Sequence, residues 1–253
     1  MDLSKKKSLY SIYSIKKQNG KKRIIFAPCE ELKKAQKELA EKLEEKELVS
    51  EFCHGFKRGS NASDSAKMHE NKKWVMTIDI CNFFPSITSD MLMPFMTEYE
   101  IDLATYNNRL VQGSPSSPII SNIIFRELDG HIARLFLKRG IDYTRYADDI
   151  AISGLNRVQK KLFIRYFRAI LRKYGFKIKY EKVKFMSNKY SQKVLGINVN
   201  NGSSINSETR KALRAAIHQK NITDQELGYL AYIRSVNYKQ YKKLVEGTDY
   251  DFR

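Results

Sequence analysis

The chain has 253 residues, of which 42% are hydrophobic and 11% aromatic, so it can form a buried core and is not a disordered basic tail. Its three cysteines form no C-x-x-C pair, which argues against a disulfide framework or a zinc knuckle, and no window approaches a membrane span of about 20 apolar residues. With 46 Lys or Arg against 28 Asp or Glu, the net charge of +18 favours nucleic acid as a partner, ahead of an anionic membrane surface.

In the first half of the chain, the residue pattern predicts one amphipathic helix and one buried strand. Residues 30–48 place their leucines on one side of a helix, with alternating Lys and Glu elsewhere. Residues 74–80, WVMTIDI, are a β-rich run, and Asp79 lies near its end. The helix is interpreted as structural, whereas an acid at the end of an apolar strand needs a further explanation.

The second half of the chain predicts strands followed by helices. Four β-rich runs are expected to be strands: residues 141–146, 150–153, 176–179 and 194–199. The first two flank Ala147-Asp148-Asp149, which predicts a hairpin with acids at its turn. After a turn signal at 200–202 the chain is expected to be helical, with Ser207 capping one helix and Thr223 beginning a capping box for another. The fold class is therefore mixed α+β with an all-helical C-terminal part.

The excess positive charge is concentrated in residues 157–193, where thirteen Lys or Arg stand against a single acid, Glu181. Residues 158–174 predict an amphipathic helix that stops at Gly175. Four cations repeat along another face of this helix: Lys161, Arg165, Arg168 and Arg172. Such a stripe is either a solvated face or a surface for phosphates, which would offset a repulsion of about a few tenths of a kcal/mol per i, i+4 pair.

Three carboxylates stand at the ends of apolar strands: Asp79, Asp148 and Asp149. One such acid is usually a cap or a turn residue, but three on neighbouring strands repel one another unless a cation neutralises them. Mg²⁺ prefers oxygen ligands and typically takes one or two carboxylates together with phosphates and water. Two ions about 3.5–4 Å apart, held in this way, are typical of phosphoryl transfer in polymerases and nucleases.

Further motifs surround these acids. In chain order they are KRIIFAP at 22–28, HGFKRGS at 54–60, DICNFFPSI at 79–87, QGSPSSP at 112–118, YTRYADD at 143–149, residues 175–184 and VLG at 194–196. In these blocks and their order, the sequence resembles bacterial reverse transcriptases of the retron and group II intron type. The retron signature Asn-Ala-x-x-His is similar to residues 65–69, with Ser65 in place of the Asn. The resemblance implies a right-hand polymerase fold. Its fingers would span residues 1–78 with a contribution from 95–125, its palm, with an antiparallel sheet, 79–202, and its small helical thumb 203–253.

The resemblance also implies roles for the acids. Asp79 and Asp148 would hold two Mg²⁺ ions, with Mn²⁺ as an alternative, and the Ile80 carbonyl would assist. Asp149 would complete the catalytic and metal-binding set by supporting this pair electrostatically.

For the nucleotide, the resemblance implies contacts from several parts of the chain. Phe84, five residues after Asp79, would block a ribose 2′-OH and so select deoxynucleotides, whereas Phe83 is expected in the core. Gln112 would lie near the incoming sugar and base. Arg23 would reach the triphosphate, with Lys21 or Lys22 as alternatives.

The basic window would then contact nucleic acid, either the template–primer duplex or a bound structured RNA. Its expected nucleic-acid-binding residues are Lys161, Arg165, Arg168, Arg172, Lys177 and Lys179. Lys182 would bind the nucleotide as the acid for the leaving pyrophosphate, with an ordinary surface lysine as the alternative.

The implied activity is RNA-directed DNA synthesis in the cytoplasm. The implied partners are a dedicated structured noncoding RNA as template, dNTPs, the DNA product and a separate effector protein of an antiphage defence system, with no membrane. About fifty residues follow Gly202, so any second activity is expected from a partner. Two alternatives stay open: a catalytically silent scaffold that binds a noncoding RNA, and a template-independent or RNA-synthesising polymerase.

Overall fold

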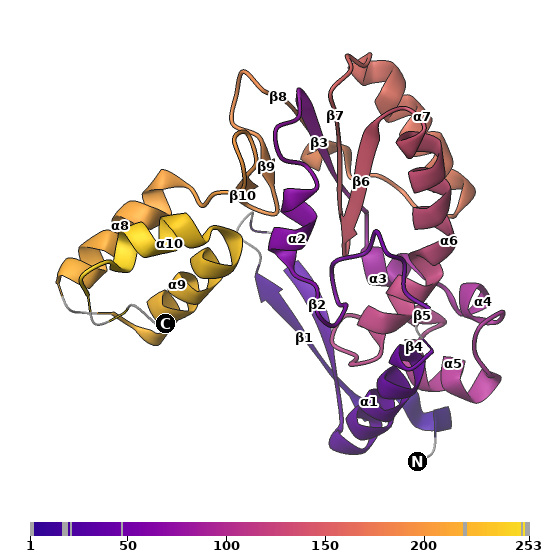
Figure 1. Cartoon of the computed structure of the whole chain (residues 1–253). Coiled ribbons are helices and arrows are strands. Elements are labelled where there is room, and N and C mark those ends of the chain that lie inside the picture. Colours follow the sequence, from indigo (N-terminus) through magenta and orange to yellow (C-terminus); the bar gives the residue numbers. More distant parts are fainter. Residues whose placement is uncertain are drawn as a thin grey trace.

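Among the described residues, β6, β7, β3 and β8 form an antiparallel sheet in that order (Figure 1). The computed structural model describes residues 3–16, 20, 22–46, 48–219, 222–248 and 250. The strands of this sheet are β3 (Trp74–Asp79), β6 (Ile141–Tyr146), β7 (Asp149–Gly154) and β8 (Lys184–Ser187). Because β3 lies between β7 and β8, Asp79 ends an inner strand of the sheet.

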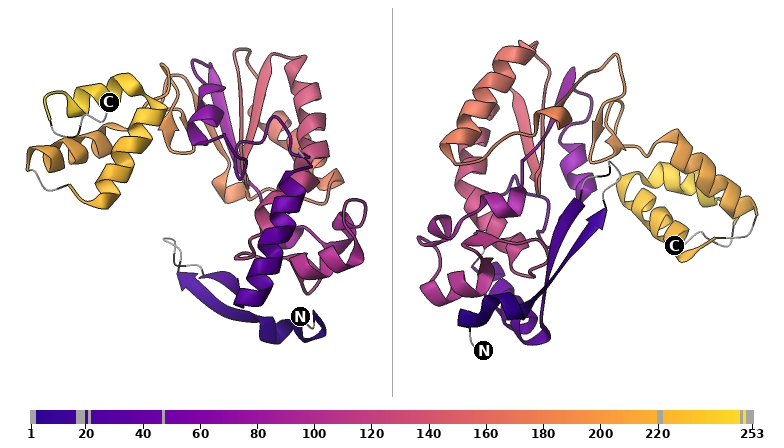
Figure 2. Two further views of the ribbon diagram at one scale, coloured as in Figure 1. Left: turned by 60° about the horizontal axis from the view of Figure 1, so that its bottom comes forward. Right: turned by 180° about the vertical axis from the view of Figure 1, so that it is seen from behind.

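One face of the sheet is covered by two helices, α6 (Ser117–Leu137) and α7 (Lys160–Lys173) (Figures 1 and 2). Successive side chains of a strand point to opposite faces. On β3, Trp74, Met76 and Ile78 therefore share the face that packs in the core with these helices. Burial of such large apolar side chains contributes about 1.5–3 kcal/mol each, so this face fixes the register of β3.

The opposite face of the sheet is covered only in part. Val75 of β3 packs in a second core with α2 (Ala62–Lys67) and the short strands β9 (Lys193–Val194) and β10 (Ile197–Asn198). Asp79 belongs to this face because it lies four residues after Val75 in the same strand. The register of β3 therefore puts the acid on the face that the helices leave open.

A buried hydrogen-bond network attaches the segment after α2 to this face. His69 contacts the Ser153 hydroxyl through Nδ1 at 2.7 Å and the Thr144 hydroxyl through Nε2 at 2.8 Å. The Ser65 hydroxyl lies 2.8 Å from the same Thr144 oxygen. Burial of the imidazole lowers the pKa of His69 to about 3, so the ring is neutral. The Ser-Ala-x-x-His segment thus has a structural role here.

The N-terminal part of the chain, which is expected to form the fingers, contains a long hairpin with helices at its base (Figures 1 and 2). The elements are β1 (Tyr10–Lys16), β2 (Lys22–Pro28), α1 (Glu30–Glu44) and α5 (Glu98–Ala104). Buried Gln36 of α1 donates to the Tyr10 hydroxyl of β1 at 2.8 Å and to the Leu103 carbonyl oxygen of α5 at 2.9 Å. These two bonds link the hairpin, α1 and α5. The other short elements are η1 (Leu3–Leu9), α3 (Phe83–Ser86), α4 (Ser89–Leu92), β4 (Thr105–Tyr106), β5 (Arg109–Leu110) and η2 (Tyr180–Lys182).

The C-terminal helices form a separate lobe beside the sheet (Figures 1 and 2). They are α8 (Ser207–His218), α9 (Asp224–Val236) and α10 (Tyr238–Val245). Leu230, Ile233 and Tyr241 are buried between them, and the core continues into β9 and β10. The capping box at Thr223 is confirmed. The right-hand arrangement of fingers, palm and thumb agrees with the expected fold class. Within the described residues, no helix is long and apolar enough to cross a bilayer.

Several expected elements need correction. Residues 176–179 are not a strand: they make one bridge, Ile178 with Ile80. The edge strand that pairs with β3 is β8 instead. Residues 194–199 are divided between β9 and β10, because Leu195 and Gly196 both have positive φ and turn the chain. Asn206, not Ser207, caps α8. The division into fingers (1–78), palm (79–202) and thumb (203–253) stays a prediction, and its first border falls inside β3.

The other strong patterns are confirmed. The helix expected over 30–48 is α1, and the hairpin expected at 141–153 is β6–β7. The helix expected over 158–174 is α7, and Gly175 follows it with a φ of +83°, a conformation that favours glycine.

Candidate active site

The pairing of β3 with β7 brings the acids together. Asp79 lies directly opposite Asp149 in the register, and the Ile80 amide donates to the Asp148 carbonyl oxygen at 3.1 Å. Ala147 and Asp148 form the turn between β6 and β7, here called the acidic turn. Ala147 has a φ of 56° and Asp148 does not have a positive φ, the pattern of a type II′ hairpin turn.

The electrostatics of these acids reflect burial and mutual repulsion. Asp79 is only 4% exposed. Burial, followed by the charge of Asp79, raises the pKa of Asp148. Asp149 is exposed as a residue, but partial burial of its carboxylate removes solvation, and this cause, followed by the charges of Asp148 and Asp79, raises its pKa to about 6. The Lys182 ammonium donates a hydrogen bond to Asp79 Oδ2, and Lys179 Nζ lies 3.9 Å from Oδ1.

Asp79 and Asp148 line a cleft of about 610 Å³, here called the Asp79 cleft. All residues predicted to bind the nucleotide line this cleft: Arg23, Phe84, Gln112 and Lys182. Ile80, Lys22 and Lys179 also line it, whereas Lys21 lies outside the described residues. The structure therefore joins residues from the fingers hairpin, the sheet and the segment after α7 in one site.

Two backbone contacts place the fingers residues at the cleft. The Phe26 amide of β2 donates to the Gln112 carbonyl oxygen at 2.8 Å. Gly113 has a φ of +116°, and a Cβ built on it would lie 2.4 Å from the Phe26 carbonyl oxygen. Only glycine permits both the conformation and this approach. Gly113 of the QGSP motif thus allows the backbone of Gln112 to pack against β2, the strand that contains Arg23.

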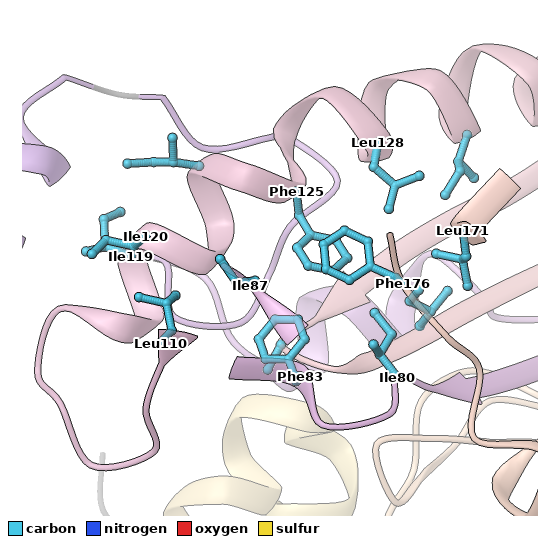
Figure 3. Packing of buried hydrophobic residues seen from close by; sticks show 14 of the residues in the cluster. Ile80, Phe83, Ile87, Leu110, Ile119, Ile120, Phe125, Leu128, Leu171 and Phe176 are labelled. Carbon is cyan, nitrogen blue, oxygen red and sulfur yellow. The ribbon is translucent and has the colours of Figure 1, made fainter. Parts of the chain in front are cut away.

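The ring of Phe84 is in contact with two other rings. Its centroid is 5.2 Å from that of Phe83 and 6.2 Å from that of Phe56, with which it is stacked at 30°. Phe83 is buried and packs 5.2 Å from Phe125 of α6, in the core that also contains Phe176 (Figure 3). The expectation that Phe83 is a core residue is confirmed, and Phe84 is half-buried at the edge of the cleft.

Sequence reasoning gave no role to two residues at this site. Phe56 lines the cleft and has a φ of 54°, which is unusual for a bulky side chain. Arg145 is fully buried next to the acidic turn and donates to the Ala147 carbonyl oxygen at 3.3 Å. Both stand in recognised motifs, HGFKRGS and YTRYADD. The position of Arg145 inside a predicted strand, three residues before Asp148, was the signal that could have identified it.

The donor set of the cleft is consistent with Mg²⁺. Within the described residues, no group of three or more His, Cys, Asp or Glu side chains is arranged for a metal ion. Asp79 and Asp148 nevertheless share one cleft and repel each other, and a lysine ammonium contacts Asp79. Two carboxylates open to phosphates and water match the usual Mg²⁺ environment. Asp149 lines a neighbouring groove of about 590 Å³ instead, together with Thr77 and Leu195.

The expected nucleic-acid-binding cations occupy two different surfaces. Lys179 lines the Asp79 cleft, and Lys177 is exposed close to it in the chain. The four cations of α7 are all exposed: Lys161, Arg165, Arg168 and Arg172. Because α7 buries Phe167 and Leu171 against the helix-covered face of the sheet, its cationic stripe lies on the outer side of the helix, where Arg168 donates to the Tyr180 hydroxyl at 2.9 Å. None of these four cations lines the Asp79 cleft.

Comparisons with known proteins agree with this geometry. A family model described as reverse transcriptase (RNA-dependent DNA polymerase) matches residues 15–199. The retron Mx65 reverse transcriptase of Myxococcus xanthus is 31% identical over 93% of this chain and 63% of its own length. The retron Ec86 reverse transcriptase of Escherichia coli is 28% identical over 93% of this chain and 79% of its own. The chain thus spans less than two thirds of the first relative and about four fifths of the second.

Solved structures show the same fold at low sequence identity. A foamy viral protease-reverse transcriptase in complex with double-stranded DNA has a TM-score of 0.51 and 19% identity, over 94% of this chain and 40% of the other. Telomerase from Candida albicans, in complex with a fragment of telomeric RNA, has a TM-score of 0.56 and 12% identity, over 96% of this chain and 57% of the other.

Proposed function

Because this chain belongs to the reverse transcriptase family, and to its retron type, we propose that it copies an RNA template into DNA. The observation that carries the proposal is the Asp79 cleft, in which Asp79 and Asp148 share one cavity with Arg23, Gln112 and Phe84. Paired carboxylates suit metal-assisted phosphoryl transfer, and the other side chains suit recognition of a nucleoside triphosphate.

In this proposal, Asp79 and Asp148 hold two Mg²⁺ ions, or Mn²⁺, with the Ile80 carbonyl assisting and Asp149 lending negative charge from the next groove. Bound metal would activate the primer hydroxyl and neutralise the departing pyrophosphate. Lys182, whose pKa is raised by its hydrogen bond to Asp79, stays protonated and can give a proton to the pyrophosphate.

The remaining residues of the cleft orient the nucleotide. Arg23 contacts the triphosphate, because a guanidinium binds phosphate oxygens in a fixed geometry. Gln112 lies against the sugar and base, held in place by its backbone bond to Phe26. Phe84 fills the space that a ribose 2′-OH would need, which favours deoxynucleotides.

Partners and location follow from the retron resemblance. We infer a dedicated structured noncoding RNA as template and a DNA product that acts with a separate effector protein in antiphage defence. The free cysteines, Cys29, Cys53 and Cys81, are consistent with a reducing cytoplasm.

The test is primer extension by the full chain with an RNA template, a DNA primer, dNTPs and Mg²⁺, with RNA co-purified from the host as a second template. We expect labelled DNA from the wild type and a loss of about 100- to 1,000-fold in Asp148→Asn, as for removal of an electrostatic catalytic group. Asp90→Asn, an exposed acid of α4, is the matched control. Absence of DNA in all wild-type reactions would favour the silent scaffold, and preferential use of ribonucleotides would favour an RNA-synthesising polymerase.

The α7 stripe supports a second contact with RNA, outside the cleft. We infer that Lys161, Arg165, Arg168 and Arg172 bind a structured part of the RNA that is not being copied. The double variant Arg165→Glu/Arg172→Glu should bind RNA more weakly. The slope of the logarithm of the binding constant against the logarithm of the salt concentration should also become shallower, by about 0.7–0.9 for each phosphate that the variant no longer binds. Extension of a short primer–template should not change. The charge-matched control is Lys34→Glu/Lys37→Glu on exposed positions of α1. An unchanged salt slope in the α7 variant would refute this interaction.

A further inference from the structure

We propose that Phe56 is a positioning residue for sugar selection: its ring supports the ring of Phe84 and thereby sets the space for the 2′ position of the nucleotide. This inference rests on the proposed role of Phe84. Phe56 is 45% exposed, lines the Asp79 cleft and is stacked on Phe84. Because this ring is exposed, burial of apolar surface does not explain why a phenylalanine stands at this position.

The backbone of Phe56 is held in a conformation that large residues rarely adopt. Its φ of 54° lies in the left-handed region. Such conformations persist only where the surroundings enforce them, and they are concentrated at functional sites. Here the enforcing group is Asn122, a fully buried residue of α6 whose Nδ2 donates to the carbonyl oxygens of Gly55 at 2.9 Å and Phe56 at 3.2 Å.

The loop that contains Gly55 and Phe56 is in direct contact with the acidic turn. A Cβ built on Gly55 would lie 2.6 Å from the Ala147 amide nitrogen, so the two backbones are in close contact. Arg145 donates to Asn122 Oδ1 at 3.1 Å and to the Ala147 carbonyl oxygen at 3.3 Å. The backbone of Phe56, from which the ring extends, is therefore held in place relative to Asp148, the acid that follows Ala147.

Phe84 is in contact with two rings in this arrangement. Phe83 is anchored in the core beside Phe125, and Phe56 stacks on Phe84 from the loop before α2. Without the Phe56 ring, Phe84 could shift into the vacated space. A sugar with a 2′-OH would then meet a mobile ring instead of a fixed one, and discrimination would fall although Phe84 is present.

The experiment compares the ratio of kcat/KM for a dNTP and the matching rNTP in primer extension by the full chain. Because an aromatic pair of this kind corresponds to about a 3- to 10-fold change in an equilibrium, we expect Phe56→Ala to lower the dNTP/rNTP ratio about 3- to 10-fold. Phe56→Tyr, which keeps the ring, should retain the wild-type ratio. Phe95→Ala is the control, since Phe95 is also 45% exposed but lies in another groove, beside Met91 and Tyr174. If Phe56→Ala does not fold, Phe56→Leu replaces it and should lower the ratio in the same direction.

A double-mutant cycle separates this inference from the function on which it rests. In a Phe84→Ala background, Phe56→Ala should change the ratio no further, because its effect passes through Phe84. If Phe84→Ala leaves the ratio unchanged, the proposed role of Phe84 fails. If Phe84→Ala lowers the ratio but Phe56→Ala and Phe56→Leu do not, the inference about Phe56 alone is overturned. A further decrease in the double variant would also overturn it, since Phe56 would then act independently.

Discussion

Arg145 and Asp129 form a bidentate ion pair with both side chains fully buried, at 3.0 Å from Nε to Oδ1 and 2.9 Å from Nη2 to Oδ2. Burial is the largest single influence and lowers the pKa of the guanidinium, but the charge of Asp129, the charges of Cys53 and Tyr143 and the hydrogen bond to Asp129 together outweigh it, so the pKa of Arg145 is raised. Tyr143 donates to Asp129 Oδ1 at 2.7 Å. This pair connects α6 to the strand that leads into the acidic turn.

We expect Asp129→Ala to lower the free energy of unfolding by about 3–5 kcal/mol, because it leaves a buried guanidinium without its counter-charge. Urea denaturation followed by circular dichroism measures the change. Lys33→Ala, which breaks the exposed pair with Glu30, should cost less than about 0.5 kcal/mol. A loss below about 1 kcal/mol for Asp129→Ala would mean that other groups neutralise Arg145.

Gly55→Ala should reduce DNA synthesis by about 100-fold, because its Cβ would displace the acidic turn and misplace Asp148. The comparison variant is Gly228→Ala, at an exposed position of α9 where a Cβ meets no atom within 4 Å. That change should stabilise the helix by about 0.5–1 kcal/mol and leave synthesis unchanged. Near-normal activity in Gly55→Ala would show that the turn tolerates the displacement.

The stability of the protein should decrease as the pH falls from about 6.5 toward 3, partly through His69. Its pKa is lowered to about 3 in the folded state, so an unfolded chain with a pKa near 6.5 binds the extra proton first. The contribution of the neutral His69 to the free energy of unfolding is fully present above about pH 6.5. Below about pH 6.5 it decreases by up to about 1.4 kcal/mol per pH unit. Urea denaturation at pH 7 and pH 5 measures the slope, which should be smaller in His69→Asn. Equal slopes would contradict a neutral buried imidazole.

Lys182→Met should have opposite effects on metal binding and on turnover. Loss of the ammonium next to Asp79 should raise the affinity of the nucleic-acid-free protein for Mn²⁺, by about 5-fold for an interaction of about 1 kcal/mol. Turnover should fall, because the proton donor for pyrophosphate is removed. Electron paramagnetic resonance of free Mn²⁺ gives the first quantity and primer extension the second. Lys189→Met, an exposed lysine outside the cleft, is the control. Weaker Mn²⁺ binding in Lys182→Met would exclude competition between the lysine and a cation.

Local patterns in the sequence predicted the elements that depend on neighbouring residues. The apolar period of α7, its stop at Gly175 and the capping box at Thr223 are all local, and each is present in the structure. The error at 176–179 has a physical reason. These residues pair with the segment just after β3 through one bridge, so their β propensity is satisfied without a full strand. Propensity alone does not distinguish the two cases.

The sequence by itself determined the acids, their place at strand ends, the order of the motifs and therefore the family. Tertiary structure alone decided that Lys179 lines the Asp79 cleft while none of the four α7 cations does. It also decided that Phe56 stacks on Phe84 and that Asp129 neutralises Arg145. The physical reason is that periodicity reports which side of an element is buried. Which distant side chain lies against that element depends on how sheet, helices and loops pack together.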